Sequence, residues 1–128
     1  MIASRGVGLA APQVGRPLRV IVVLEGEGPL PMVNPEIVRG AGESVAEEGC
    51  LSLPFYYGMV NRHDKVTVKG LDARGRPFRR RFSGLVARAV QHEIDHLNGI
   101  VFKDRLVEGA ELRFAPPEAA AARSRAAP

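Results

Sequence analysis

Gln91-His92-Glu93-Ile94-Asp95-His96-Leu97-Asn98-Gly99 is the most informative run in this chain of 128 residues. In a helix, residues four apart lie on one face and one turn above each other, so His92 and His96 can bind one metal ion through two imidazole nitrogens. Glu93 lies about 100° round the helix from His92. From there a carboxylate can reach a water held by the metal, as in an HExxH site. The simpler interpretation is a helix that carries two histidines by chance.

The neighbouring residues predict a nearly buried helix over residues 84–98. Its polar side chains fall on one narrow stripe and apolar residues cover the rest; the stripe consists of Arg88, Gln91, Asp95 and Asn98. The two histidines and Glu93 project into the apolar arc, where an unpaired polar group costs on the order of 1–3 kcal/mol. A bound metal ion would offset that cost. Gly99 should end the helix, because glycine readily adopts the left-handed conformation.

Composition and charge are those of an ordinary globular domain. Hydrophobic residues make up 45% and charged residues 25%, and the length fits one domain. The formal charge of +4 comes from basic residues spread along the chain; the one run, Arg79-Arg80-Arg81, fits a solvated strand face. We therefore expect no direct nucleic-acid binding.

The single cysteine, Cys50, cannot form an internal disulfide, so nothing here requires an oxidising compartment. No stretch of 18 apolar residues is present, and residues 1–5 are too short for a signal peptide. These features predict a protein of the bacterial cytoplasm or of an organellar matrix. They also predict that it does not bind a membrane.

Periodicity predicts several strands. The β-branched run at residues 19–24 predicts a buried strand, whereas residues 32–39, interrupted by Pro35, predict an edge or bulged strand. Residues 65–69 alternate with period two and should pair with residues 76–82 in a hairpin. From residue 109 onward Ala, Pro and Arg dominate. We therefore predict one domain over residues 1–108 and a tail, frayed helix or disordered, over residues 109–128.

Three further positions carry polar side chains that could bind a ligand or a metal ion or take part in catalysis. Gly6-Val7-Gly8-Leu9-Ala10-Ala11-Pro12-Gln13 leaves the backbone open to a ligand, and the Gln13 amide could stabilise an oxyanion, although a surface glutamine is the simpler interpretation. The Cys50 thiolate would be a strong ligand for zinc or ferrous iron; alone it could equally be a small buried residue, but two histidines complete a set of three ligands. Arg62 could meet a carboxylate or a peptide carbonyl, or lie at the surface.

In this order, the glycine-rich motif, Glu48-Gly49-Cys50-Leu51-Ser52 and Gln91-His92-Glu93-Ile94-Asp95-His96 resemble the three signature motifs of peptide deformylases, over about residues 6–106. The resemblance implies an α+β fold in which mostly antiparallel sheets pack around a central HExxH helix. It also implies a metal-dependent hydrolase that removes the formyl group from N-terminal formylmethionine of nascent polypeptides near the ribosome. One divalent ion is expected, with Fe²⁺ as the natural metal and Zn²⁺, Ni²⁺ or Co²⁺ allowed.

The same resemblance implies roles for individual residues. The metal ligands are Cys50, His92 and His96, a water on the metal is the nucleophile, and Glu93 is the general acid/base. Gln13 and the backbone N–H of Leu51 hold the formyl oxygen. Val7, Gly8 and the residues near Arg88 and Ala89 would flank the methionine pocket and bind substrate, with Gly8 pairing the substrate as an added strand. Arg62 is a further substrate-binding candidate, on the chemistry of its own side chain.

One departure from the family pattern bears on activity. Members carry a further segment with a first helix ahead of the glycine motif, and here only residues 1–5 precede it. One alternative is therefore a truncated, inactive relative that binds peptides. A second is a zinc endopeptidase, because such enzymes share the HExxH motif. An endopeptidase would need a third ligand downstream, for which Glu108, Glu111 and Glu118 are the candidates.

Overall fold

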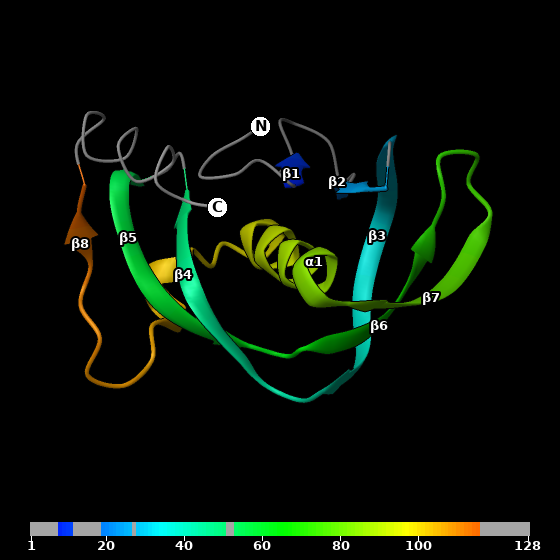
Figure 1. Ribbon diagram of the computed structural model, residues 1–128. Coiled ribbons are helices and arrows are strands. Elements are labelled where there is room, and N and C mark those ends of the chain that lie inside the picture. The colour runs from blue at the N-terminus through cyan, green and yellow to red at the C-terminus, as the bar shows by residue number, and fades with distance from the viewer. Residues whose placement is uncertain (1–7, 12–18, 27, 51–52, 116–128) are drawn as a thin grey trace.

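The computed structural model describes residues 8–11, 19–26, 28–50 and 53–115 (Figure 1). Within these ranges the chain forms two antiparallel sheets and an α-helix. In chain order the elements are β1 (Gly8–Ala11), β2 (Val20–Glu25), β3 (Gly28–Ala41), β4 (Ser44–Cys50), β5 (Leu53–Arg62), β6 (Lys65–Leu71), β7 (Pro77–Ser83), α1 (Gly84–Leu97), the short 3-10 helix η2 (Phe102–Arg105) and β8 (Arg113–Phe114).

The larger sheet has the strand order β1-β2-β3-β6-β7. Its neighbouring strands are all antiparallel, and the predicted hairpin is confirmed because β6 pairs with β7 from Lys65↔Ser83 to Leu71↔Pro77. The predicted buried strand is β2, whose Ile21 and Val23 are almost fully buried. The β-branched run at residues 19–24, the alternation at residues 65–69 and the turn that follows it therefore predicted these three strands correctly.

β3 corrects one expectation and confirms another. It is an interior strand that pairs with β2 on one side and β6 on the other, so it is not an edge strand. It is bulged, as Pro35 indicated, because its register with β6 shifts between Val33 and Glu36. Proline has no N–H to donate to the ladder, and the bulge accommodates that loss. The adjacent Asn34 takes a φ of 50° and donates its N–H to the Arg19 carbonyl at 2.7 Å.

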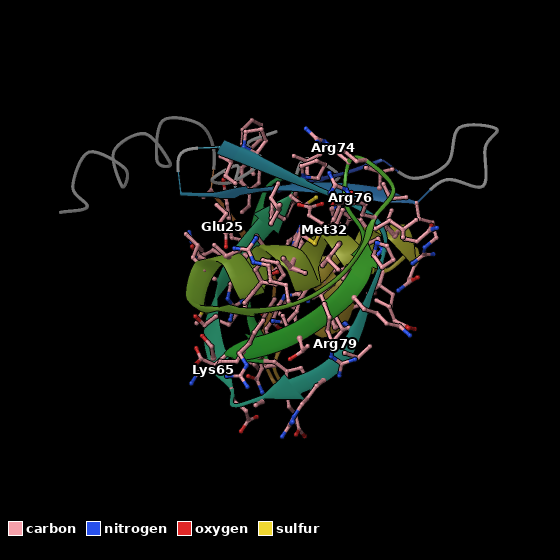
Figure 2. All side chains as sticks on the ribbon, turned by 90° about the vertical axis from the view of Figure 1, so that its right-hand side faces the viewer. Glu25, Met32, Lys65, Arg74, Arg76 and Arg79 are labelled. Carbon is pink, nitrogen blue, oxygen red and sulfur yellow. The ribbon has the colours of Figure 1, made fainter. Side chains whose placement is uncertain are left out.

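The arginine run lies on β7 and is exposed along its whole length, as expected for a solvated strand face. Side chains from this part of the sheet, Lys65 and Arg79 among them, extend outward in Figure 2. Phe82 on the same strand is 3% exposed and joins the core. By period-two alternation Phe82 shares its face of β7 with Arg80, whose guanidinium carbon lies 5.1 Å from the Phe82 ring centroid, whereas Arg79 and Arg81 lie on the other face.

The smaller sheet has the order β4-β5-β8 and curves past α1 in Figure 1. Its third strand lies beyond the expected boundary at residue 108, since Arg113–Phe114 pairs with Tyr56–Tyr57 and Ala115 is buried. The physical reason is aromatic packing, because the Phe114 ring lies 5.2 Å from Tyr56 and 6.5 Å from Phe55 between centroids. Residues 116–128 of the expected tail lie outside the described residues.

The helix α1 spans Gly84–Leu97, almost as predicted, and Gly99 follows it with a φ of 76°. Ala87, Val90 and Ile94 on α1 belong to one hydrophobic core together with residues of the larger sheet. In Figure 1 the helix lies between the two sheets. Among the residues that the structure describes, no helix combines the length and apolar character needed to cross a bilayer.

Candidate metal centre

A thiol and two imidazoles meet where the end of β4 faces α1. Cys50 Sγ lies 3.3 Å from His96 Nε2, although the two residues are 46 positions apart in sequence. His92, one turn earlier on α1, joins them, and one ligand atom from each of the three residues lies within 4.8 Å of the others. The structure thus brings together the three residues that the sequence analysis named as metal ligands.

The donor set fits a divalent transition metal. A tetrahedral ion with a metal–sulfur bond of about 2.3 Å and metal–nitrogen bonds of about 2.0–2.1 Å holds its ligand atoms roughly 3.3–3.6 Å apart. The separation of 3.3 Å between sulfur and His96 Nε2 matches that range. Thiolate and imidazole ligands suit Zn²⁺ and Fe²⁺, and three protein ligands leave a coordination position open.

The electrostatics of the cluster also favour a cation. The hydrogen bond to Cys50, assisted by Glu93, raises the pKa of His96 to about 10. Burial lowers the pKa of His92, but hydrogen bonds to Cys50 and Glu48 outweigh burial and raise it to about 9. Both rings therefore lie in a field that stabilises positive charge. A divalent cation would be stabilised by the same field.

Glu93 lies beside the ligands, as the helical spacing predicted. Its side chain comes from α1, the residue is 7% exposed, and Oε1 is 3.3 Å from His96 Nδ1. A buried carboxylate at this place can accept a proton from a water between it and the ligand cluster.

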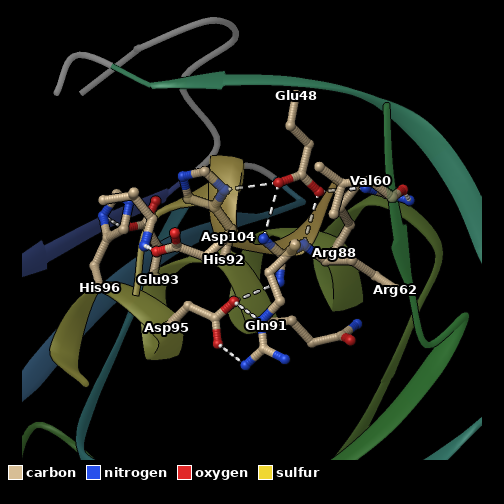
Figure 3. Close-up of polar contacts among 12 residues, drawn as sticks. Glu48, Val60, Arg62, Arg88, Gln91, His92, Glu93, Asp95, His96 and Asp104 are labelled. Carbon is tan, nitrogen blue, oxygen red and sulfur yellow. Dashed lines mark hydrogen bonds and ion pairs between the residues drawn. The ribbon is translucent and has the colours of Figure 1, made fainter. Parts of the chain in front are cut away.

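Glu48 is the functional residue that the sequence analysis missed. It is 8% exposed and its Oε1 accepts a hydrogen bond from His92 Nδ1 at 2.9 Å (Figure 3). Burial raises its pKa, but the bonds from His92 and Arg62 outweigh burial and lower it to about 2, so the carboxylate is ionised. One signal was present in the sequence: Glu48 precedes Cys50 by two residues on a strand, so both side chains tend towards one face.

Arg62 is placed differently from the expectation of a substrate-binding residue. It is 7% exposed, and its guanidinium donates to Glu48 at 2.7 and 2.9 Å and to Asp95 at 2.8 Å. Asp95 in turn accepts two bonds from Arg105 at 3.0 and 2.9 Å. The arginine does meet carboxylates, but they belong to the protein, one on β4 and one on α1.

Arg88 and Ala89, also expected to bind substrate, contact groups of the protein in this structure. Arg88 donates to the Glu48 carboxylate and to the backbone carbonyls of Ser44 and Val60. Ala89 is 4% exposed and packs in the hydrophobic core. Within the polar stripe of α1, Arg88 and Asp95 thus contact residues of the smaller sheet, whereas Asn98 accepts a hydrogen bond from Arg19.

Gly8 is in β1, which forms one edge of the larger sheet and pairs through Gly8↔Val23 on its inner side. The other predicted substrate and oxyanion residues, Val7, Gln13 and Leu51, lie outside the described residues, as does Glu118.

Among the residues described, the group with metal-ligand geometry is Cys50, His92 and His96, and neither Glu108 nor Glu111 belongs to it. The third ligand that an endopeptidase would take from downstream is thus not at this site within the described ranges.

Comparison with known proteins gives a consistent result. The polypeptide deformylase family model matches residues 1–111. The peptide deformylase of Thermomicrobium roseum is 52% identical over 125 residues, covering 91% of this chain and 71% of the relative. That of Halothermothrix orenii is 54% identical over 113 residues, covering 87% of this chain and 73% of the relative.

Solved structures agree with the fold. A peptide deformylase from Legionella pneumophila superposes with a TM-score of 0.71 at 51% identity, covering 80% of this chain and 63% of that one. A class I type b peptide deformylase from Acinetobacter baumannii, solved with Met-Ala-Ser bound, gives a TM-score of 0.73 at 44% identity, covering 79% and 70%. The chain thus spans less than two thirds of the Legionella structure.

Proposed function

The chain belongs to the polypeptide deformylase family, and from that premise we propose that it removes the formyl group from N-terminal formylmethionine of nascent polypeptides. These matches confirm the family that the sequence motifs indicated. Members of this family are metal-dependent enzymes with this activity. The observation that supports the activity of this chain most directly is the approach of Cys50 Sγ to His96 Nε2 at 3.3 Å, with His92 beside them.

Cys50, His92 and His96 hold one divalent ion in this proposal. When bound, the ion supplies an activated water and polarises the formyl carbonyl. Glu93 accepts the proton of the attacking water and passes it to the departing amine. Gln13 and the backbone N–H of Leu51 donate to the formyl oxygen, where loss of one donor typically costs about 10²–10³ in rate.

The substrate binds in this proposal as an added strand along the free edge of β1, with Gly8 at its start. An edge strand offers unpaired backbone N–H and C=O groups to an extended peptide. Support comes from the position of β1 at the sheet edge and from the related enzyme solved with Met-Ala-Ser.

The finer features of the proposal follow from the same site. Fe²⁺ is the proposed natural metal, with Zn²⁺, Ni²⁺ or Co²⁺ as substitutes that thiolate and imidazole ligands also accept. The helix α1 is the central scaffold of one catalytic domain, whose boundary we move from residue 108 to residue 115 because of β8. The enzyme would act in the bacterial cytoplasm or an organellar matrix, near the ribosome, where formylated chains emerge.

The direct test is formate release from formyl-Met-Ala-Ser by protein loaded with Fe²⁺ under exclusion of oxygen. We expect turnover that stops when a chelator removes the ion. Cleavage of an internal bond in an unformylated peptide would instead indicate an endopeptidase. Binding of the formylated peptide without formate release would indicate an inactive, peptide-binding relative.

A further inference from the structure

Five charged residues form a continuous network behind the metal ligands, buried or nearly so except for Arg105, whose side chain is 46% exposed, and we refer to them as the charge network. Its members are Glu48 on β4, Arg62 on β5, Arg88 and Asp95 on α1, and Arg105 on η2. Figure 3 shows Arg62 between the Glu48 and Asp95 carboxylates, with His92 on the far side of Glu48. Three arginines thus contact two carboxylates, and four elements meet through them.

The network reaches the candidate metal centre through one hydrogen bond. His92 Nδ1 donates to Glu48 Oε1 at 2.9 Å, which fixes the rotation of the ring and leaves Nε2 as the nitrogen that would bind an ion. A carboxylate in this relation to a ligating histidine sets the orientation of the ring and its strength as a ligand. His96 differs, because its Nδ1 lies beside Glu93, which we assign to proton transfer.

Glu48 can orient His92 only if its own carboxylate is held in place, and Arg62 is the residue best suited to hold it. The guanidinium binds both Glu48 oxygens in a fork, at 2.7 and 2.9 Å, and its third nitrogen reaches Asp95 at 2.8 Å. Hydrogen bonds to two carboxylates on opposite sides require the planar guanidinium group, because an ammonium group has no rigid, forked set of donors. Arg62 therefore ties β4, β5 and α1 into one arrangement.

A buried charge network of this kind is poor evidence for stability as such, because well-packed apolar residues would often serve as well. Orientation of the metal ligand gives a specific reason for charged residues here. We propose that Arg62 is a positioning residue of the metal centre, which acts through Glu48 on His92 and governs how tightly the ion is held. The proposal rests on the proposed function only in requiring that Cys50, His92 and His96 bind a metal.

The test measures metal binding without substrate. Wild-type protein and Arg62→Lys are loaded anaerobically with Co²⁺, whose visible spectrum reports coordination, and the dissociation constant is obtained by chelator competition. Arg62→Lys keeps the charge and removes the fork. We expect it to weaken Co²⁺ affinity about 10–100-fold, as for other residues behind metal ligands, and to alter the Co²⁺ spectrum. Arg80→Lys is the matched control, because Arg80 pairs with Glu25 at the exposed surface, and should change neither quantity.

A double-mutant cycle shows whether Arg62 acts through Glu48. Glu48→Gln should weaken affinity, and adding Arg62→Lys to it should cost much less than in the wild-type background. Additive losses would contradict the proposed route. If Arg62→Lys lowers the urea midpoint of the metal-free protein yet leaves Co²⁺ affinity and spectrum unchanged, the residue is structural and the proposal is wrong. Should Arg62→Lys fail to fold, Asp95→Asn, which releases the other side of the guanidinium, takes its place with the same expected results.

The two proposals can fail separately. Stoichiometric Co²⁺ binding without formate release under any metal loading would overturn the proposed function, and the effect of Arg62 on affinity would still be measured. No Co²⁺ binding by the wild-type protein would overturn both. Formate release with unchanged affinity in Arg62→Lys would overturn only the positioning role.

Discussion

Glu93 is the side chain on which the proposed reaction depends most, because it is buried beside His96 and a neighbour of His92. General acid–base catalysis typically contributes about 10²–10⁴-fold in rate. We predict that Glu93→Ala lowers kcat for formate release by at least about 10²-fold while one ion per chain is retained. A formate assay with metal analysis measures both, and Glu36→Ala at the exposed surface serves as control. A rate near that of the wild type would remove Glu93 from the mechanism.

At this scale the sequence predicted the ligands but not their support. The positions of His92, Glu93 and His96 relative to one another could be predicted because helical spacing depends only on nearby residues. Cys50 could be added because a thiolate and two imidazoles bind the same metal ions. The contacts of Glu48 and Arg62 could not be foreseen, because they join residues of β4, β5 and α1 that are far apart in sequence. Nothing within a few residues of Arg62 indicates that two carboxylates, 14 and 33 positions away, will enclose it.

Among the elements, β6 is packed closely against β3 at the bulge, and Gly70 makes this possible. A Cβ built at Gly70 would lie 2.9 Å from the Val33 carbonyl oxygen, which is backbone and cannot move aside cheaply. We predict that Gly70→Ala lowers the free energy of unfolding by about 1–3 kcal/mol, as overpacking usually does. Urea denaturation measures this, with Gly28→Ala as control since nothing lies within 4 Å of its Cβ. Equal stabilities for the two variants would contradict this packing.

The stability of the β6–β7 turn should depend on pH through the carboxyl group of Asp72. Hydrogen bonds from the backbone N–H groups of Arg76 and Arg74 to its Oδ1, both 2.9 Å, hold the pKa of this exposed carboxyl below its ordinary value of 3.8. A carboxyl group whose pKa is lowered by folding stabilises the native state at pH values above its unfolded-state pKa. This contribution is lost as the pH falls from that value through the lower pKa of the folded state. We predict an NMR titration midpoint for Asp72 below 3.8. A midpoint at or above the ordinary value would show that these bonds are absent in solution.

Elements with a local signal were predicted well, and those that depend on distant pairing were not. The helix α1 and the β6–β7 hairpin follow from periodicity and turn residues. β8 is only two residues long, and its partner on β5 lies more than fifty positions earlier. The interior position of β3 likewise depends on which strands assemble on each side, and Pro35 alone could not reveal that.

For the whole molecule, metal binding should stabilise the fold, because the ligands come from two parts of it. Cys50 belongs to the smaller sheet, whereas the histidines are on α1, which packs against the larger sheet. A ligand present at 100 times its Kd stabilises the native state by about 2.7 kcal/mol. We predict a higher Tm with Fe²⁺ or Co²⁺ than with chelator in anaerobic calorimetry. An unchanged Tm would contradict metal binding across these elements, and Cys50→Ser should reduce the shift.

X-ray absorption of anaerobically loaded protein tests the central claim most directly, since it reports the ligands of the ion itself. We predict one sulfur at about 2.3 Å and two imidazole nitrogens at about 2.0–2.1 Å, with the sulfur signal lost in Cys50→Ser. An ion surrounded only by oxygen and nitrogen in the wild-type protein would contradict the account.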